Sequence, residues 1–148
     1  MEEVINICKI VHDDIGKGYS ETIYQEAICI LLRKNNIQYS KEVVLEKWFQ
    51  DNFLGIIRSD IIIHQNLIIE CKAIDGLLKK SHFPQLITYM EAAKIKNGIF
   101  VNFCQNPEQH VLDIYTAIKD TDDFYYFYKN TDNTVFFKYN SKGLFIKP

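Results

Sequence analysis

Apolar residues near the start of the chain recur with a helical period. The spacing i, i+3, i+4 runs through residues 2–15 and again through residues 20–35, which predicts two amphipathic helices. Gly16 and Gly18 stand between these stretches, and glycine commonly ends a helix. Ser20 is a residue type that caps a helix N-terminus. The chain therefore opens with a pair of helices, each with one face suited to packing.

The pattern then changes to that of β-structure. Residues 39–49, 53–63 and 67–72 are rich in β-branched, aliphatic and aromatic residues, and short polar segments divide them. The segment QDN at 50–52 predicts the first of the two turns. Three consecutive strands joined by short turns are expected to form a meander.

The second half of the chain predicts one more helix, a buried strand and an appended segment. Ser81 is expected to cap a helix that closes at Asn97-Gly98, and GIFVNF at 98–103 predicts a short strand. A last helix is expected at about 108–119, before an aromatic hairpin at 124–137 that KNTDN splits. This order of elements predicts an α/β fold with a mixed sheet flanked by helices. The hairpin aromatics are expected to cover a sheet edge, with a dimer surface or base stacking as alternatives.

Size and composition bound the class of protein. The chain has 148 residues, 47% hydrophobic and 24% charged, which suits one globular domain with a single core. A net charge of −2 argues against a strongly cationic nucleic-acid binder, so any grip on a polyanion must come from a local patch, a bound metal or a second subunit.

The spacing of the cysteines and histidines predicts no metal site. No apolar run approaches a membrane span, no signal peptide is found, and the cysteines lack zinc spacing, so an intracellular protein with reduced thiols is expected. No histidine has a second histidine at ligand spacing, so no zinc site is predicted. Tyr24 and Tyr89 are interpreted as core aromatics with satisfied hydroxyls.

Three charged residues interrupt the most apolar hairpin of the chain. Asp60, Glu70 and Lys72 lie in DIIIHQNLIIECK, and charged groups are rarely buried unless something compensates them. A two-residue turn would send Asp60 to the wrong side of the hairpin. A three-residue loop over 64–66, with Asn66 in the left-handed conformation, pairs Asp60 with Glu70 and is the register we expect.

Two carboxylates and an ammonium at one place suit a divalent metal that cleaves phosphodiesters. Opposed like charges in a hairpin are destabilising unless a cation lies between them. The alternative is a salt-bridged triad in which Lys72 neutralises both acids without any chemistry. Arg58 is expected on the same face, either as a phosphate contact or as a partner of Glu70.

Several motifs in a fixed order resemble one known family. Gly18, Glu21 and Tyr24 in GYSETIY spell the motif of the GxxExxY proteins of the PD-(D/E)xK nuclease superfamily. His12, RSD at 58–60, IIECKA at 68–73, HFPQLITYM at 82–90 and VNF at 101–103 extend the resemblance. It covers about residues 5–103. Residues 1–106 are therefore expected to form a nuclease-like core with a restriction-endonuclease-like sheet, and residues 107–148 an extension packed on the same domain.

The resemblance implies roles for the charged residues. Asp60 and Glu70 would chelate Mg²⁺ or Mn²⁺ with the backbone carbonyl of Cys71, and Glu21 would complete the acidic cluster through a water. These are the oxygen ligands that such hard cations prefer. Lys72 would orient or deprotonate the attacking water and stabilise developing charge.

The resemblance also places Gln85 beside the site as a polar companion and implies phosphodiester hydrolysis. DNA is favoured over RNA as the substrate. Because the chain is small and mildly acidic, a homodimer or a partner protein is expected to help hold the nucleic acid. The alternative function is a non-catalytic nucleic-acid-binding or assembly module that keeps the nuclease fold.

Overall fold

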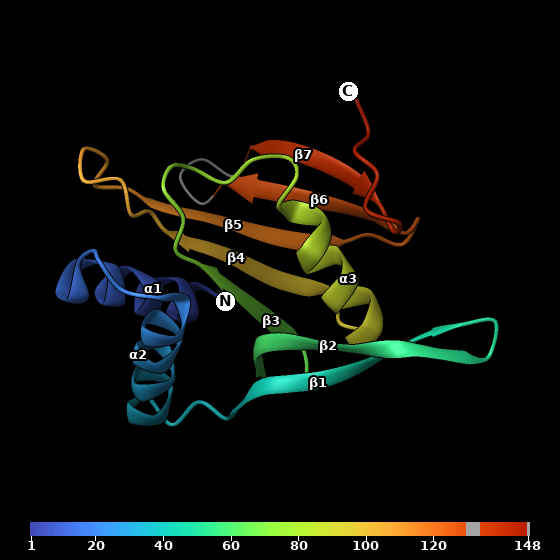
Figure 1. Cartoon of the computed structure of the whole chain (residues 1–148), viewed down its shortest axis with the longest axis horizontal. Coiled ribbons are helices and arrows are strands. Elements are labelled where there is room, and N and C mark those ends of the chain that lie inside the picture. Colours follow the sequence, from blue (N-terminus) through green and yellow to red (C-terminus); the bar gives the residue numbers. More distant parts are fainter. Residues whose placement is uncertain (130–133, 148) are drawn as a thin grey trace.

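The fold is one mixed sheet with helices on both faces (Figure 1). The computed structural model describes residues 1–129 and 134–147. The seven strands lie in the sheet in sequence order, which agrees with the expected α/β architecture. The elements are α1 (Glu2–Ile15), α2 (Glu21–Lys34), β1 (Tyr39–Phe49), β2 (Asn52–Ile63), β3 (Leu67–Lys72), α3 (Phe83–Ala93), β4 (Asn97–Phe103), β5 (Leu112–Lys119), β6 (Phe124–Lys129) and β7 (Val135–Asn140).

Alternate side chains of the central strands supply two cores. Ile61 and Ile69 pack with the apolar faces of α1 and α2, whereas Ile62 and Ile68 pack with α3. Both faces of the central sheet are thus covered, which explains the nearly continuous apolar runs of β2 and β3. No helix among the described residues is long and apolar enough to cross a membrane.

The β2–β3 turn has the expected length. Ile63 pairs with Leu67, which leaves three residues in the turn and confirms the predicted register. The left-handed conformation falls on His64 (φ 49°) and Gln65 (φ 59°), so the expectation for Asn66 was wrong. The turn therefore has its two left-handed residues at its first and second positions, not at its last.

The connection through α3 makes the sheet mixed. β3 and β4 are parallel, and α3 crosses between them. The helix begins after His82 instead of after Ser81, with Pro84 in its first turn, where a missing N–H costs nothing. It ends at Ala93 and is followed by Lys94 in the left-handed conformation. The expected end at Asn97-Gly98 was wrong, since both residues belong to β4.

The last helix of the sequence prediction is a strand. Residues 112–119 form β5, which pairs antiparallel with β4, so the expected helix at about 108–119 was wrong. Ile114 packs on the α1–α2 side and Tyr115 on the α3 side, so the apolar residues of this segment fit two covered faces. The open edge of β4 supplies the partner, and tertiary pairing overrides a weak helical pattern.

The aromatic hairpin extends the same sheet. β6 pairs with β5 and β7 pairs with β6, so the hairpin is the continuation of one sheet. Of the KNTDN segment that was expected to split the hairpin, Lys129 ends β6, and residues 130–133 lie outside the described residues. Phe127 and Tyr139 are buried under α3. The aromatic residues therefore complete the α3 side of the core.

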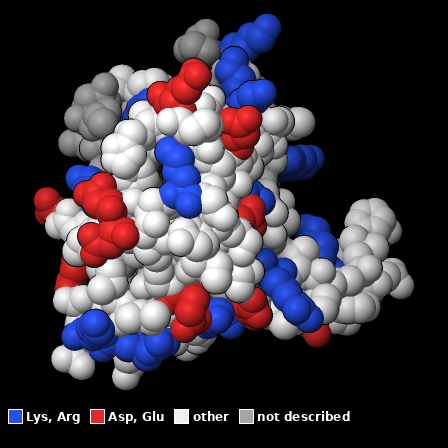
Figure 2. Space-filling view, turned by 60° about the vertical axis from the view of Figure 1, so that its left-hand side comes forward, with Lys and Arg blue, Asp and Glu red and all other residues white. Residues whose placement is uncertain are grey.

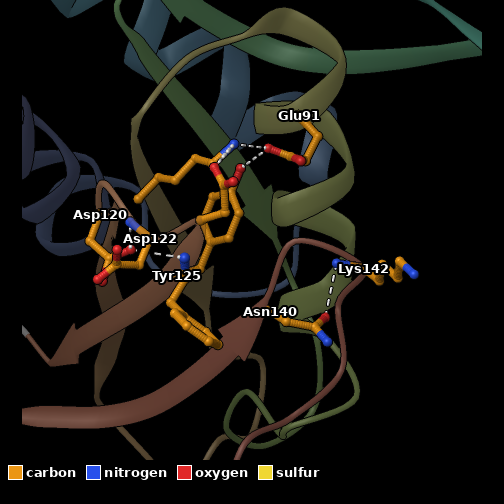
Figure 3. A network of polar contacts seen from close by, with 9 residues as sticks. Glu91, Asp120, Asp122, Tyr125, Asn140 and Lys142 are labelled. Atoms are coloured by element: carbon orange, nitrogen blue, oxygen red, sulfur yellow. Dashed lines mark hydrogen bonds and ion pairs between the residues drawn. The ribbon is translucent and has the colours of Figure 1, made fainter.

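A polar network fastens α3 to these C-terminal strands (Figure 3). The Lys119 ammonium and the Tyr125 hydroxyl each donate to Oε2 of Glu91, at 2.5 Å in both cases. In the adjoining turn, Oδ1 of Asp120 accepts from the backbone N–H groups of Asp122 and Phe124, at 2.9 Å each. Residues from β5 and β6 thus hold the outer side of the helix.

Candidate metal and phosphodiester site

Asp60 and Glu70 lie at the point where β2 and β3 separate. The antiparallel ladder between these strands ends at Ile61 and Ile69. Beyond it, the Asp60 N–H donates to Oε1 of Glu70 at 2.9 Å, and the Cys71 N–H donates to Oδ2 of Asp60 at 2.8 Å. Each carboxylate therefore takes the place of a backbone carbonyl from the opposite strand. The acids themselves join the two strands at this position.

The other side of Asp60 is also irregular. β1 and β2 pair at Lys41 with Ile61 and at Val43 with Ser59, but Glu42 between them has φ 50°. Asp60 thus lies where both neighbouring ladders are interrupted. Such irregularities often re-aim a side chain beside a functional site.

Burial sets the electrostatics of the two acids. Glu70 is only 2% exposed, and this desolvation, with the nearby charge of Asp60, raises its pKa from 4.5 to about 9. Desolvation also raises the pKa of Asp60, against the lowering effect of the Cys71 N–H. At neutral pH and without a cation, Glu70 holds a proton. A divalent ion would compensate both charges, so this pair of acids fits the donor chemistry of Mg²⁺ or Mn²⁺.

The salt-bridged triad that the sequence allowed as an alternative does not form among the described residues. Glu70 and Lys72 share a strand face, and the Lys72 charge lowers the pKa of both acids. Within residues 1–129 and 134–147, however, the side chain of Lys72 takes part in no ion pair and no hydrogen bond. Its ammonium remains available to an anion.

α3 brings Tyr89 near the acids, and Gln85 lies beside Tyr89 on the same helix. The Gln85 amide donates to the Tyr89 hydroxyl at 3.1 Å. Burial and then the charges of Glu70, Asp60 and Glu21 raise the pKa of Tyr89. The Tyr89 hydroxyl is satisfied, as the sequence suggested, yet it also lies in the field of the acidic residues. The spacing of four residues between Gln85 and Tyr89, which places both on one face of the helix, was the signal in the sequence for this contact.

α2 approaches the site from its N-terminal end. Glu21 is the first residue of this helix and is exposed to solvent. One turn later, the buried Gln25 donates from Nε2 to the backbone carbonyl of Asp60 at 3.1 Å. Sequence reasoning missed Gln25, because a polar residue beside an apolar stripe carries no distinctive pattern. Tyr24 is fully buried, and its hydroxyl donates to Gly16 O at 2.6 Å, which confirms it as a core residue.

Gln105 connects three segments around the site and was also missed. Its side chain accepts from the Gly18 N–H at 2.7 Å and donates to the Tyr24 hydroxyl at 2.9 Å. Its own N–H donates to Ile74 O at 2.8 Å, just after Lys72. The turn before Glu21 and the loop after Lys72 are therefore fastened to one residue.

Arg58 lies on an exposed part of β2 and pairs across the ladder with Val44. No ion pair joins it to Glu70 in the described part of the chain, so that alternative is not realised. The alternative of a phosphate contact stays a prediction.

The wider surface is mixed in charge. One face shows basic and acidic side chains interspersed, without a large area of one sign (Figure 2), as the net charge of −2 suggests. A cavity of about 660 Å³ lies at the C-terminal end of β2, where Tyr39, Ile62 and His64 are among its lining residues. The acidic site is separate from that cavity.

A match with a family model shows to which superfamily the chain belongs. The model, described as the PD-(D/E)XK nuclease superfamily, matches residues 1–114. The chain belongs to the PD-(D/E)XK nuclease superfamily. Members of this superfamily are generally nucleases, and they usually use divalent metals. Placement in the GxxExxY subfamily stays a prediction.

The fold is similar to that of a solved structure. It is the crystal structure of SSO0001, with 24% sequence identity and a TM-score of 0.50 over 64% of this chain. The match spans 48% of that chain, so about half of its length has a counterpart here. This likeness supports the fold alone. A search of curated proteins finds no match.

Proposed function

We propose that this PD-(D/E)XK superfamily member is a metal-dependent nuclease that hydrolyses phosphodiester bonds, with DNA favoured over RNA. One observation carries the proposal. The buried Glu70 and its neighbour Asp60 are held together by backbone hydrogen bonds although the two carboxylates repel each other when both are ionised. Such an arrangement is costly unless a cation compensates it.

Asp60 and Glu70 would hold Mg²⁺ or Mn²⁺ together with the backbone carbonyl of Cys71. The backbone occupies Oδ2 of Asp60 and Oε1 of Glu70, so Oδ1 and Oε2 are the oxygens proposed for the ion. When bound, the ion supplies Lewis acidity, which lowers the pKa of water and neutralises charge on phosphoryl oxygens. Glu21 would act on the same cluster through a water.

Lys72 would stabilise the negative charge that develops on the phosphoryl oxygens and orient the attacking water. Its lack of an ion pair among the described residues supports this role over that of a structural partner. Gln85, bonded to Tyr89, would position water or substrate from α3. Arg58 would contact a neighbouring phosphate.

We propose that a second copy of the chain or a partner protein provides additional contacts with the nucleic acid. The outer part of the β1–β2 hairpin projects beyond the body of the sheet (Figure 1). It carries large apolar side chains that are each more than half exposed, namely Val44, Trp48, Phe49, Phe53, Leu54 and Ile56. Exposed apolar surface of this kind is typical of an interaction site. Light scattering of the wild type beside Trp48→Ser tests whether the chain self-associates there.

The test of the nuclease is cleavage with matched variants. Plasmid, single-stranded DNA and RNA are incubated with the protein and Mg²⁺ or Mn²⁺, beside Asp60→Asn and Glu70→Gln, with EDTA as the metal-free control. Cleavage by the wild type that both substitutions and EDTA abolish supports the proposal. Equal background in all reactions, from protein with an intact circular dichroism spectrum, contradicts it and favours the non-catalytic module. Cleavage of RNA but not DNA overturns the substrate preference.

A further inference from the structure

A second group of metal-ligating side chains lies outside the acidic site. His12 and Asp13 near the end of α1 meet His110, which precedes β5. One potential ligand atom from each of these residues lies within 4.8 Å of the other two. His110 is remote in sequence, so spacing alone gave no reason to expect a zinc site. The fold supplies the second histidine.

Only one of the two ring nitrogens of the buried His12 has a partner among the described residues. This residue is 8% exposed, and its Nδ1 lies 3.1 Å from Oδ1 of Asp13. Its Nε2 is buried and has no hydrogen-bond partner among the described residues. A buried polar atom without a partner calls for an explanation such as an ion or water. The His110 ring lies against the His12 ring, with 4.8 Å between their centroids.

The surroundings hold these residues in place before any ion binds. The Lys17 ammonium donates to Cys104 O at 2.6 Å and to Gln109 O at 2.7 Å. The residue directly before His110 is thus tied to the turn that follows α1. Ligands of one ion with bonds of about 2.1 Å can be at most about 4.2 Å apart. Asp13 and His110 are exposed, so their side chains have room to rotate toward a shared ion.

We propose that His12, Asp13 and His110 form a second metal site, for Zn²⁺ or a similar first-row divalent ion. Two imidazoles and one carboxylate suit such borderline ions, whereas Mg²⁺ prefers a set of oxygens. The site fastens the end of α1 to the connection between β4 and β5. It is independent of the nuclease proposal, because no residue is shared with the acidic cluster.

The test measures thermal unfolding of the full chain with and without Zn²⁺. Zn²⁺ is expected to raise the melting temperature of the wild type by several degrees, because an ion that binds only the folded state stabilises it. His110→Asn is expected to abolish this shift. His64→Asn, at an exposed histidine whose φ of 49° asparagine tolerates, is the matched control that keeps it.

Glu70→Gln separates the two sites, since it removes an acidic ligand and should leave the Zn²⁺ shift intact. A second readout is the visible absorption of bound Co²⁺, expected in the wild type and lost in His110→Asn. The proposal is overturned if His110→Asn keeps the shift or the Co²⁺ bands, or if Glu70→Gln loses them. A wild type that shows neither effect also overturns it. Cleavage activity enters none of these outcomes.

Discussion

Glu70 accepts a hydrogen bond from the backbone N–H of Asp60, so one acid of the proposed metal site fixes the position of the other. Asp60 in turn accepts from the N–H of Cys71, directly after Glu70. This reciprocal arrangement replaces the ladder where β2 and β3 part. Neither acid can move freely, and both keep one oxygen for another partner. Such preorganisation favours ion binding because little ordering remains to be done.

Replacing Glu70 by glutamine is expected to stabilise the metal-free protein at pH 8 by more than about 1 kcal/mol. The pKa of Glu70 is about 9 in the folded chain, against an ordinary value of 4.5. Between these values the unfolded chain has lost a proton that the folded chain retains, so stability falls as pH rises. The amide of the variant resembles the protonated acid and removes this slope. Chemical denaturation of both proteins at pH 5 and pH 8, with EDTA, measures how the unfolding free energy changes with pH. The same change in both proteins would refute the expectation.

Metal binding by the wild type should release a proton. Because Glu70 is protonated below about pH 9 without an ion, binding of Mg²⁺ or Mn²⁺ must displace that proton. The affinity is therefore expected to rise with pH through the neutral range. Calorimetric titrations in two buffers of different ionisation enthalpy report the number of protons released. A value of zero near pH 7, with binding intact, would place the ion elsewhere.

Lys72→Met is expected to lower the cleavage rate by about 10²-fold or more while leaving stability almost unchanged. The reason is that Lys72 has no ion-pair partner among the described residues whose loss would weaken the fold. Lys79→Met, at an exposed neighbouring lysine, is the control. Single-turnover cleavage and urea unfolding separate the two effects. A destabilised variant would instead favour a structural role for Lys72.

Gln25→Leu should weaken the positioning of Asp60. The substitution preserves most of the side-chain volume but removes the donor to the Asp60 carbonyl. We expect a loss of about 1 kcal/mol in unfolding free energy and a fall in cleavage rate of up to about 10²-fold from misplacement of the acid. Gln38→Leu, at an exposed position, is the comparison. Unchanged kcat in a destabilised Gln25→Leu protein would limit Gln25 to stability.

Glu91→Gln should loosen the C-terminal strands without touching the acidic site. The carboxylate of Glu91 accepts from both Lys119 and Tyr125, so an amide removes the shorter of the two ion pairs of the Lys119 ammonium and leaves only Asp123, at 3.4 Å (Figure 3). A cost of roughly 1–3 kcal/mol is expected. Glu108→Gln is the surface control, and hydrogen exchange should show faster exchange in β5 and β6. Equal protection in the two variants would contradict the proposed fastening.

The prediction of the central region succeeded because local signals agreed. The strands over 39–72 combine β-branched residues with short polar turns, and the turn length alone set the register that brings Asp60 beside Glu70. The prediction failed at 112–119, where the segment becomes a strand because the edge of β4 accepts a partner. Local pattern cannot report an available edge, since it depends on residues distant in sequence.

By itself the sequence determined that Asp60, Glu70 and Lys72 need compensation, because charged residues within apolar strands require it whatever their surroundings. Tertiary structure decided which contacts those groups make. It left Lys72 without an ion pair among the described residues, turned Gln25 toward the Asp60 carbonyl and brought His110 to His12. These outcomes depend on how helices and loops from separate parts of the chain pack together. Residue spacing carries no information about packing at that range.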